Sequence, residues 1–267
     1  MPSDRRKLSC WTHPFFCQAH PPITLHLFPS TGLKLAAALV TGFIFLNTAT
    51  AADPNQTKES FSAKVTKTFA YKYLKYLPEG YDGKKKFPLL LFLHGAGERG
   101  DNLDLVTKHG PPKLIKKGKE FPFIIISPQC PKGTWWDAEG LDALLDEFIG
   151  KHAVDESRIY CTGLSMGGYG TWALGGQNAK RFAALAPICG GGNRTDARRI
   201  GKKPVWVFHG AKDRTVPPEE SQRMVDALKR RGGKPKFTIY PEAGHDSWTK
   251  SYDNPKLYEW FLSHKTE

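Results

Sequence analysis

Short hydrophobic runs recur along the chain, and each one is bounded by Gly or Pro. Between them lie stretches in which apolar residues return at helical spacing. Runs that are apolar on both faces are typical of strands in a parallel sheet covered on both sides. The six runs that we interpret as strands cover residues 87–93, 121–127, 158–162, 182–188, 204–209 and 236–240.

Three stretches carry clear helix signals. Apolar residues recur at helical spacing within 141–149, Pro217-Pro218-Glu219-Glu220 is typical of a helix start, and residues 255–262 form a short terminal amphipathic stretch. Strands that alternate with helices predict an α/β fold with a mostly parallel central sheet and helices on both faces. No spacing between consecutive strands leaves room for a cap domain, so we expect residues 69–267 to form a single domain.

The N-terminal 52 residues have the pattern of a leader with a signal peptide. Lys34 is followed by the apolar run 35–46 and by Ala49-Thr50-Ala51, which supplies a small-residue cleavage site. We expect cleavage after Ala51 or Ala52 and export as a secreted or periplasmic protein. A retained anchor and a buried helix are the two alternatives. Residues 53–68 are polar and are expected to be flexible.

Composition sets limits on partners. Hydrophobic residues make up 40% of the chain, an ordinary globular mixture, and the formal net charge is +13. The basic residues are scattered and are not interleaved with an RNA-binding aromatic motif, so no nucleic-acid partner is expected. A solvated basic surface is the favoured interpretation, with an acidic polymer or an anionic membrane surface as alternatives. A membrane contact is expected only if the leader is retained, and the pattern does not define an oligomeric state.

Cysteine usage agrees with an exported chain but does not define a disulfide. Cys10 and Cys17 belong to the leader, which leaves Cys130, Cys161 and Cys189 in the remaining chain. Export permits one disulfide among these three, and sequence does not choose the pair. Buried free thiols are the favoured state.

A strong chemical signal is Gly163-Leu164-Ser165-Met166-Gly167. It follows a predicted strand directly and opens a helix-like segment, which is the context of a nucleophile elbow. The turn is tight, so the residues two before and two after the serine must be small. Ser165 is therefore the candidate nucleophile.

A serine hydroxyl needs a base, and the base needs an orienting acid. Asp213 lies just past the predicted strand at 204–209, and His245 lies just past the strand at 236–240. The order Ser, Asp, His along the chain agrees with a hydrolase built on an α/β sheet. A turn or helix-cap role for Asp213 and a surface-loop role for His245 are the alternatives. Rival residues are less well placed: Asp246, Glu219 and Glu220 as acids, and His94 and His209, which we interpret as packing residues.

Acyl transfer also requires hydrogen-bond donors for an oxyanion. The glycine-rich loop at 94–100 follows the first strong strand. One donor is expected to be the N–H of Met166, and the other the N–H of Ala96, with Gly95 as the next choice. A phosphate-binding loop is disfavoured because no Lys-Ser/Thr pair follows the glycines.

With these residues identified, the chain resembles the compact α/β-hydrolase esterases: the prolyl-oligopeptidase-like, feruloyl-esterase-like and dienelactone-hydrolase-like group. The matching motifs are HGAGERG at 94–100, PQCP at 128–131, GLSMGG at 163–168, HGAKD at 209–213 and GHDSW at 244–248. The resemblance implies a catalytic triad of Ser165, Asp213 and His245, and hydrolysis that needs no metal and no cofactor.

The resemblance leaves the substrate open. A short chain without a propeller fits esters, such as acetyl or feruloyl esters on polysaccharides or short-chain esters, better than peptides. A peptidase or amidase using the same triad is the alternative, and a non-catalytic binding protein is a third. Trp135, Trp136 and Trp248 lie just past predicted strands. They either line a substrate pocket or take part in ordinary packing.

Overall fold

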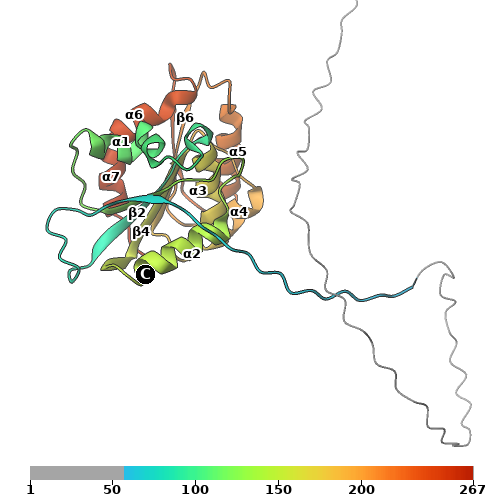
Figure 1. Ribbon diagram of the computed structural model, residues 1–267. Helices are drawn as coiled ribbons and strands as arrows, with labels where there is room; N and C mark the ends of the chain where they lie inside the picture. Colours follow the sequence, from blue (N-terminus) through green and yellow to red (C-terminus); the bar gives the residue numbers. More distant parts are fainter. Residues whose placement is uncertain (1–56, 267) are drawn as a thin grey trace, which may run out of the picture. The chain divides into compact units, whose positions relative to one another are not determined.

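The computed structural model describes residues 57–266 (Figure 1). The predicted leader, its cleavage site and Cys10 and Cys17 lie outside the described residues. The chain divides into two parts, Met1–Ala63 and Lys64–Glu267. Residues 57–63 of the first part are exposed and have no regular secondary structure. All of the strands and helices described below belong to the second part.

Seven strands form one sheet in the order β1-β3-β2-β4-β5-β6-β7. The first strand runs antiparallel to β3, and every other neighbouring pair is parallel. All parallel strands therefore end at the same edge of the sheet. The strands are β1 (Tyr73–Tyr76), β2 (Phe87–Leu93), β3 (Ile124–Pro128), β4 (Val154–Leu164), β5 (Ala184–Ile188), β6 (Trp206–Gly210) and β7 (Lys236–Tyr240).

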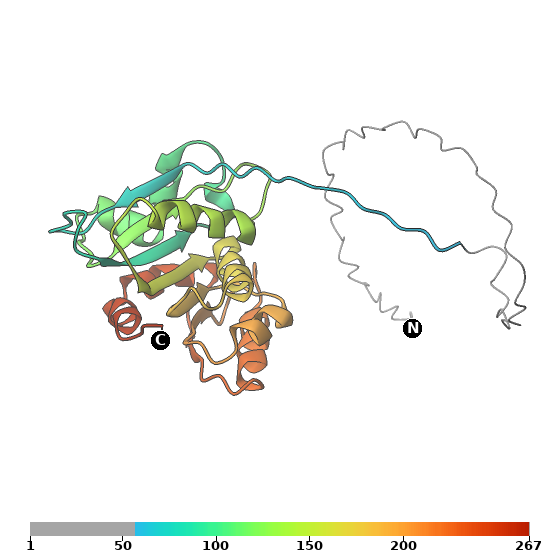
Figure 2. The same ribbon diagram turned by 90° about the horizontal axis from the view of Figure 1, so that it is seen from below.

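Helices cover both faces of this sheet (Figures 1 and 2). Between consecutive parallel strands the chain forms one α-helix, as expected for parallel crossovers. On one face lie α2 (Ala138–Ile149), α3 (Met166–Gln177), α4 (Arg194–Ile200) and α5 (Pro218–Lys229); on the other lie α1 (Gly110–Lys116), α6 (Trp248–Asp253) and α7 (Pro255–Leu262). Within residues 57–266 there are also three short 3-10 helices: η1 (Ala96–Glu98), η2 (Leu103–Lys108) and η3 (His245–Ser247).

The sheet separates two hydrophobic clusters. Along β2, Leu89, Leu91 and Leu93 belong to one cluster, whereas Leu90 and Phe92 belong to the other. This alternation is the period of two expected for a strand, and here both sets of side chains are buried. A strand buried on both faces has no polar side, which explains the continuous apolar runs in the sequence.

The predicted fold class is confirmed, but the structure contains four elements that the sequence analysis did not predict. The elements β1, α1, α4 and α6 did not appear in the prediction. The edge strand β1 is only partly buried, and α4 is a short, polar helix, so neither shows a strong hydrophobic pattern. One strand also begins later than predicted: β3 begins at Ile124 and not at Phe121. Phe121 lies before the strand, and its ring packs against Tyr258.

Cys130, Cys161 and Cys189 are buried and form no disulfide. Burial raises the pKa of the Cys161 thiol to about 12, so this thiol stays neutral at physiological pH. Over residues 57–266, none of the helices combines the length and the apolar character that crossing a membrane requires.

Leu91 lies at the centre of the sheet and has no exposed surface. Replacing it with Ala is expected to lower the free energy of unfolding by about 3 kcal/mol, because the substitution loses buried surface and leaves a cavity. Urea denaturation followed by circular dichroism measures the change. Ile239→Ala on the edge strand β7, where the side chain is 44% exposed, is the matched control. It is expected to cost less than about 1 kcal/mol, and equal costs for the two variants would contradict the placement of the core.

Candidate active site

The turn between β4 and α3 holds Ser165 in a strained backbone conformation. Its φ is 53° and its ψ is −117°, in a region that non-glycine residues rarely adopt. The turn is also crowded: a Cβ on Gly163 would lie 2.3 Å from the Gly167 carbonyl oxygen, and a Cβ on Gly167 would lie 2.0 Å from the Leu93 carbonyl oxygen. Both positions therefore require glycine, as the sequence pattern predicted on steric grounds.

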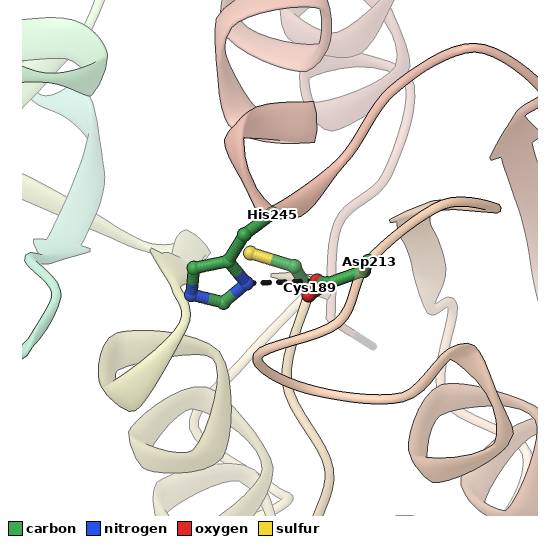
Figure 3. Close-up of side chains that lie close together, drawn as sticks. All are labelled: Cys189, Asp213 and His245. Atoms are coloured by element: carbon green, nitrogen blue, oxygen red, sulfur yellow. Dashed lines mark hydrogen bonds and ion pairs between the residues drawn. The ribbon is translucent and has the colours of Figure 1, made fainter.

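Three candidate residues from separate parts of the chain come together at the carboxyl edge of the sheet. Ser165 follows β4, Asp213 lies in the loop between β6 and α5, and His245 begins η3 after β7. The Ser165 Oγ lies 2.9 Å from His245 Nε2, and His245 Nδ1 lies 2.7 Å from Asp213 Oδ2. Figure 3 shows the contact between the imidazole and the carboxylate.

The hydrogen-bond partners of Asp213 fix the orientation of His245. The other carboxylate oxygen, Oδ1, accepts from the backbone N–H groups of Thr215 and Val216, each at 2.9 Å. Oδ2 is left to accept from His245 Nδ1, which therefore carries a proton. In the neutral imidazole the Nε2 lone pair then faces the Ser165 hydroxyl, which is the arrangement of a base that withdraws a proton from an alcohol.

The chain is similar to several known proteins. Residues 193–266 match the prolyl oligopeptidase family. The chain is 24% identical over 183 residues to a probable feruloyl esterase C of Aspergillus niger, a match covering 66% of this chain and 67% of the relative. It is 31% identical over 129 residues to the bifunctional acetylxylan esterase/xylanase XynS20E of Neocallimastix patriciarum, covering 46% of this chain and 18% of the relative.

A solved structure of a thermostable esterase is similar at a TM-score of 0.62 and 33% identity, covering 72% of this chain and 59% of that chain. The chain has the α/β-hydrolase fold. The predicted resemblance to the compact esterases and prolyl oligopeptidases is thereby confirmed. The described α/β-hydrolase domain nevertheless spans only part of these relatives, and less than a fifth of the xylan enzyme.

The glycine-rich loop passes beside Ser165, the candidate nucleophile. Gly95 is so close that a Cβ on it would lie 3.6 Å from the Ser165 Cβ and 2.8 Å from Leu164. Ala96 begins η1 and is exposed, whereas Met166 begins α3 and is buried. The first N–H groups of a helix have no partner within the helix. Met166 and Ala96 each begin a helix, so the N–H of neither residue has a partner within its own helix.

His94 holds this loop in place, in agreement with its interpretation as a packing residue. Its Nδ1 lies 2.6 Å from the Gly95 carbonyl oxygen, to which it donates, and its Nε2 accepts from the backbone N–H of Cys130 at 2.9 Å. Burial lowers the pKa of His94 to about 4, outweighing the opposite effect of the bond to Gly95. The ring is therefore neutral and links the β2 loop to the β3 loop.

The three tryptophans occupy different positions. Trp248 lies edge-on to the His245 ring, with ring centroids 5.1 Å apart. Trp135 is 55% exposed and contacts Tyr169 of α3. Trp136 is 7% exposed, and its indole N–H donates to the His94 carbonyl oxygen at 3.1 Å. Of the two roles left open for Trp136, its burial favours ordinary packing over a pocket wall, because a buried side chain offers little surface to a substrate.

Two residues beside the site were not singled out from the sequence. Cys189 directly follows β5 with a positive φ of 40°, and Figure 3 shows its sulfur next to His245 and Asp213. The sulfur and one ligand atom from each of these neighbours lie within 4.8 Å of one another, a spacing that a metal ion could bridge. Burial raises the pKa of this thiol to about 12, so at neutral pH the sulfur is protonated and a poor ligand. Glu98, in η1, is buried within 3.8 Å of His109.

Gly167→Ala tests the crowding at the elbow. We expect it to lower the free energy of unfolding by at least about 2 kcal/mol, because the new methyl group meets backbone atoms that cannot rotate away. Gly97→Ala is the matched control, since a Cβ there has nothing within 4 Å. Thermal and urea denaturation measure both variants. A Gly167→Ala protein as stable as the Gly97→Ala protein would contradict the close approach of α3 to β2.

Proposed function

We propose that this α/β-hydrolase is a serine esterase that cleaves carboxylic esters through an acyl-serine intermediate. The observation that carries the proposal is the continuous hydrogen-bond chain from Ser165 Oγ through His245 to Asp213, with contacts of 2.9 and 2.7 Å. Such a chain raises the nucleophilicity of an otherwise weak serine hydroxyl. The esterases among its relatives favour the same reaction class.

The first chemical step follows from the direction of these bonds. Ser165 Oγ attacks the ester carbonyl carbon while its proton passes to His245 Nε2. The imidazolium that forms is stabilised by the Asp213 carboxylate, whose side chain has no exposed surface. The same Nε2 proton is then given to the leaving alcohol, which departs as the carbon–oxygen bond breaks and leaves the acyl group on Ser165.

The oxyanion of the tetrahedral intermediate needs two donors. We assign them to the backbone N–H of Met166 and to that of Ala96, with Gly95 as the neighbouring alternative. Met166 directly follows Ser165, Gly95 in the glycine-rich loop approaches it, and the N-terminus of α3 adds a favourable partial positive charge. Water then attacks the acyl-serine with His245 again acting as base, which releases the acid and restores the hydroxyl.

The surroundings of the site support a proposal for the substrate class. Trp248 beside His245 and the exposed Trp135 beside Tyr169 offer flat apolar surfaces, which suit an aromatic acyl group or a sugar ring. We therefore propose acetyl or feruloyl-type esters linked to polysaccharides, or short-chain esters, as substrates. Such polymers are met outside the cytoplasm, which agrees with the export proposed from the leader pattern at residues 1–52.

Ser165→Ala removes the attacking oxygen. Turnover of an aryl ester is expected to fall by about 10⁵-fold or more, as in other serine hydrolases that lose this residue. Steady-state hydrolysis measures the loss, and covalent labelling by a fluorophosphonate reports the nucleophile directly. Ser157→Ala, a partly buried serine at the distant start of β4, is the control and should be labelled like the unaltered protein. An unaltered protein that neither labels nor turns over would favour a non-catalytic binding protein.

A peptidase or amidase is the second candidate, because residues 193–266 match the prolyl oligopeptidase family. These residues include Asp213 and His245, which act in the same way on an amide. A panel of acetyl, feruloyl and short-chain esters is expected to be turned over at least about 10²-fold faster than the corresponding anilides and peptides. The reverse order of kcat/KM would replace the esterase by the peptidase while keeping the same three residues.

A further inference from the structure

Basic residues that are scattered along the sequence come together at the amino edge of the sheet, opposite the edge that carries Ser165. Because the strands from β2 to β7 are parallel, the loops that enter them meet at this edge. The four loops that enter β4, β5, β6 and β7, which we call the basic edge, contain no Asp or Glu. Their charged residues are Lys151, Lys180, Arg181, Lys202, Lys203, Arg230, Arg231 and Lys234.

The loops at the other edge of the sheet have a different charge pattern. Those that leave β2, β3, β6 and β7 mix both signs, and acidic residues are the more numerous. The acidic residues are Glu98, Asp101, Asp104, Asp137, Asp213, Glu242 and Asp246, and the basic residues are Arg99, Lys108, Lys132, Lys212 and Arg214. The excess positive charge of the chain is therefore not spread evenly over the domain, as a merely solvated basic surface would be.

Part of the basic edge forms a pocket of about 540 Å³. Among the described residues no acidic side chain lines it, whereas four lysines do: Lys180, Lys202, Lys203 and Lys265. The last of these comes from the C-terminal residues, which return to the start of β4. There the Thr266 N–H donates to the Ser157 carbonyl oxygen at 2.8 Å. Three loops far apart in the sequence thus direct positive charge toward one pocket.

The loop that enters β7 extends this positive charge beyond the pocket. A Cβ on Gly233 would lie 2.7 Å from the Gly201 carbonyl oxygen, and a Cβ on Gly232 would lie 3.4 Å from Lys202 Cε. This loop therefore packs directly against the loop that enters β6. It adds three exposed basic residues next to the pocket, namely Arg230, Arg231 and Lys234.

A structural role accounts for only part of the basic edge. Lys151 pairs with an acid on α2, and Arg181 pairs with two. Within residues 57–266, no ion pair with a carboxylate involves Lys180, Lys202 or Lys265. None of these three lies within a helix, where a basic residue in the last turn would offset the helix dipole. Like charges around one pocket repel one another, and a bound anion relieves that repulsion.

We propose that the basic edge binds an acidic polysaccharide, whose carboxylate groups pair with the lysines of the pocket. Its lining includes no aromatic side chain on which a nucleic-acid base would stack. Among the described residues, none of the exposed large apolar side chains belongs to these loops, so the edge lacks the anchors of a membrane-binding surface. A sugar carboxylate needs neither feature, because compact ammonium groups pair with it directly.

The distance between the two edges favours a polymer over a small ligand. β4 runs from one edge to the other, and roughly 25 Å separates Ser157 from Ser165 at the usual rise of a strand. One polysaccharide chain spans that distance, whereas a small ester does not. Binding at the basic edge then raises the effective concentration of the polymer's ester groups near Ser165. Only this last consequence rests on the proposed esterase function, and the binding itself does not.

Neutralising three lysines of the pocket tests the proposal. Binding of a short oligogalacturonate, measured by isothermal titration calorimetry at low ionic strength, is expected to weaken at least about tenfold because three ion pairs are lost. The variant combines Lys180→Gln, Lys202→Gln and Lys265→Gln. A control with the same net charge neutralises three exposed lysines elsewhere, by Lys64→Gln, Lys108→Gln and Lys250→Gln. It is expected to bind almost as tightly as the unaltered protein, and equal weakening in the two variants would overturn the proposal.

Further ligands test the chemistry of the partner. A neutral xylan is expected not to bind, and about 1 M salt is expected to abolish oligogalacturonate binding, because salt screens exposed charges. Tighter binding of duplex DNA or of phosphatidylserine vesicles than of polygalacturonate would overturn the choice of an acidic polysaccharide. Ser165→Ala is expected to bind oligogalacturonate like the unaltered protein. Since no ester is cleaved in these measurements, absence of ester turnover would overturn the esterase function alone, and absence of binding would overturn this inference alone.

Discussion

The contact that the active site depends on is the close approach of the first turn of α3 to the end of β2. At Gly167 the backbone of the helix lies against the Leu93 carbonyl oxygen, with no space for a side chain. This approach forces the chain to reverse sharply between β4 and α3, and Ser165 takes the strained conformation at the corner. The strain is stable because the surrounding sheet and helix are packed and buried on both sides.

The same approach brings the other groups together. The residue after Leu93 begins the glycine-rich loop, so an elbow packed on Leu93 lies beside Gly95. Because β4, β6 and β7 are parallel, the loops that follow them meet at one edge, and Asp213 and His245 reach the same place from far along the chain. Parallel strand direction and one crowded turn thus account for the position of all three residues in the hydrogen-bond chain.

Much of this arrangement could be predicted from the sequence. Continuous apolar runs such as 87–93 predict buried strands. The glycines two residues before and two residues after Ser165 predict a tight turn, because only small residues fit at those positions. The order of Asp213 and His245 after later strands follows from the direction of a parallel sheet. The partly buried β1 and the polar α4 were missed because their hydrophobic pattern is weak. The role of Trp136 stayed open in the sequence because periodicity does not report which loop side chains turn inward.

The orientation of the Asp213 carboxylate lies beyond sequence analysis for a different reason. The sequence places this residue just past a strand, and this suggests only that it lies near the serine. Its Oδ1 accepts from the backbone N–H groups of Thr215 and Val216, which leaves Oδ2 to accept from His245 Nδ1. Backbone donors in the loop before α5 therefore determine which nitrogen of the imidazole faces Ser165. This orientation is a property of the assembled fold, and it follows only from the donors and acceptors that surround the carboxylate in three dimensions.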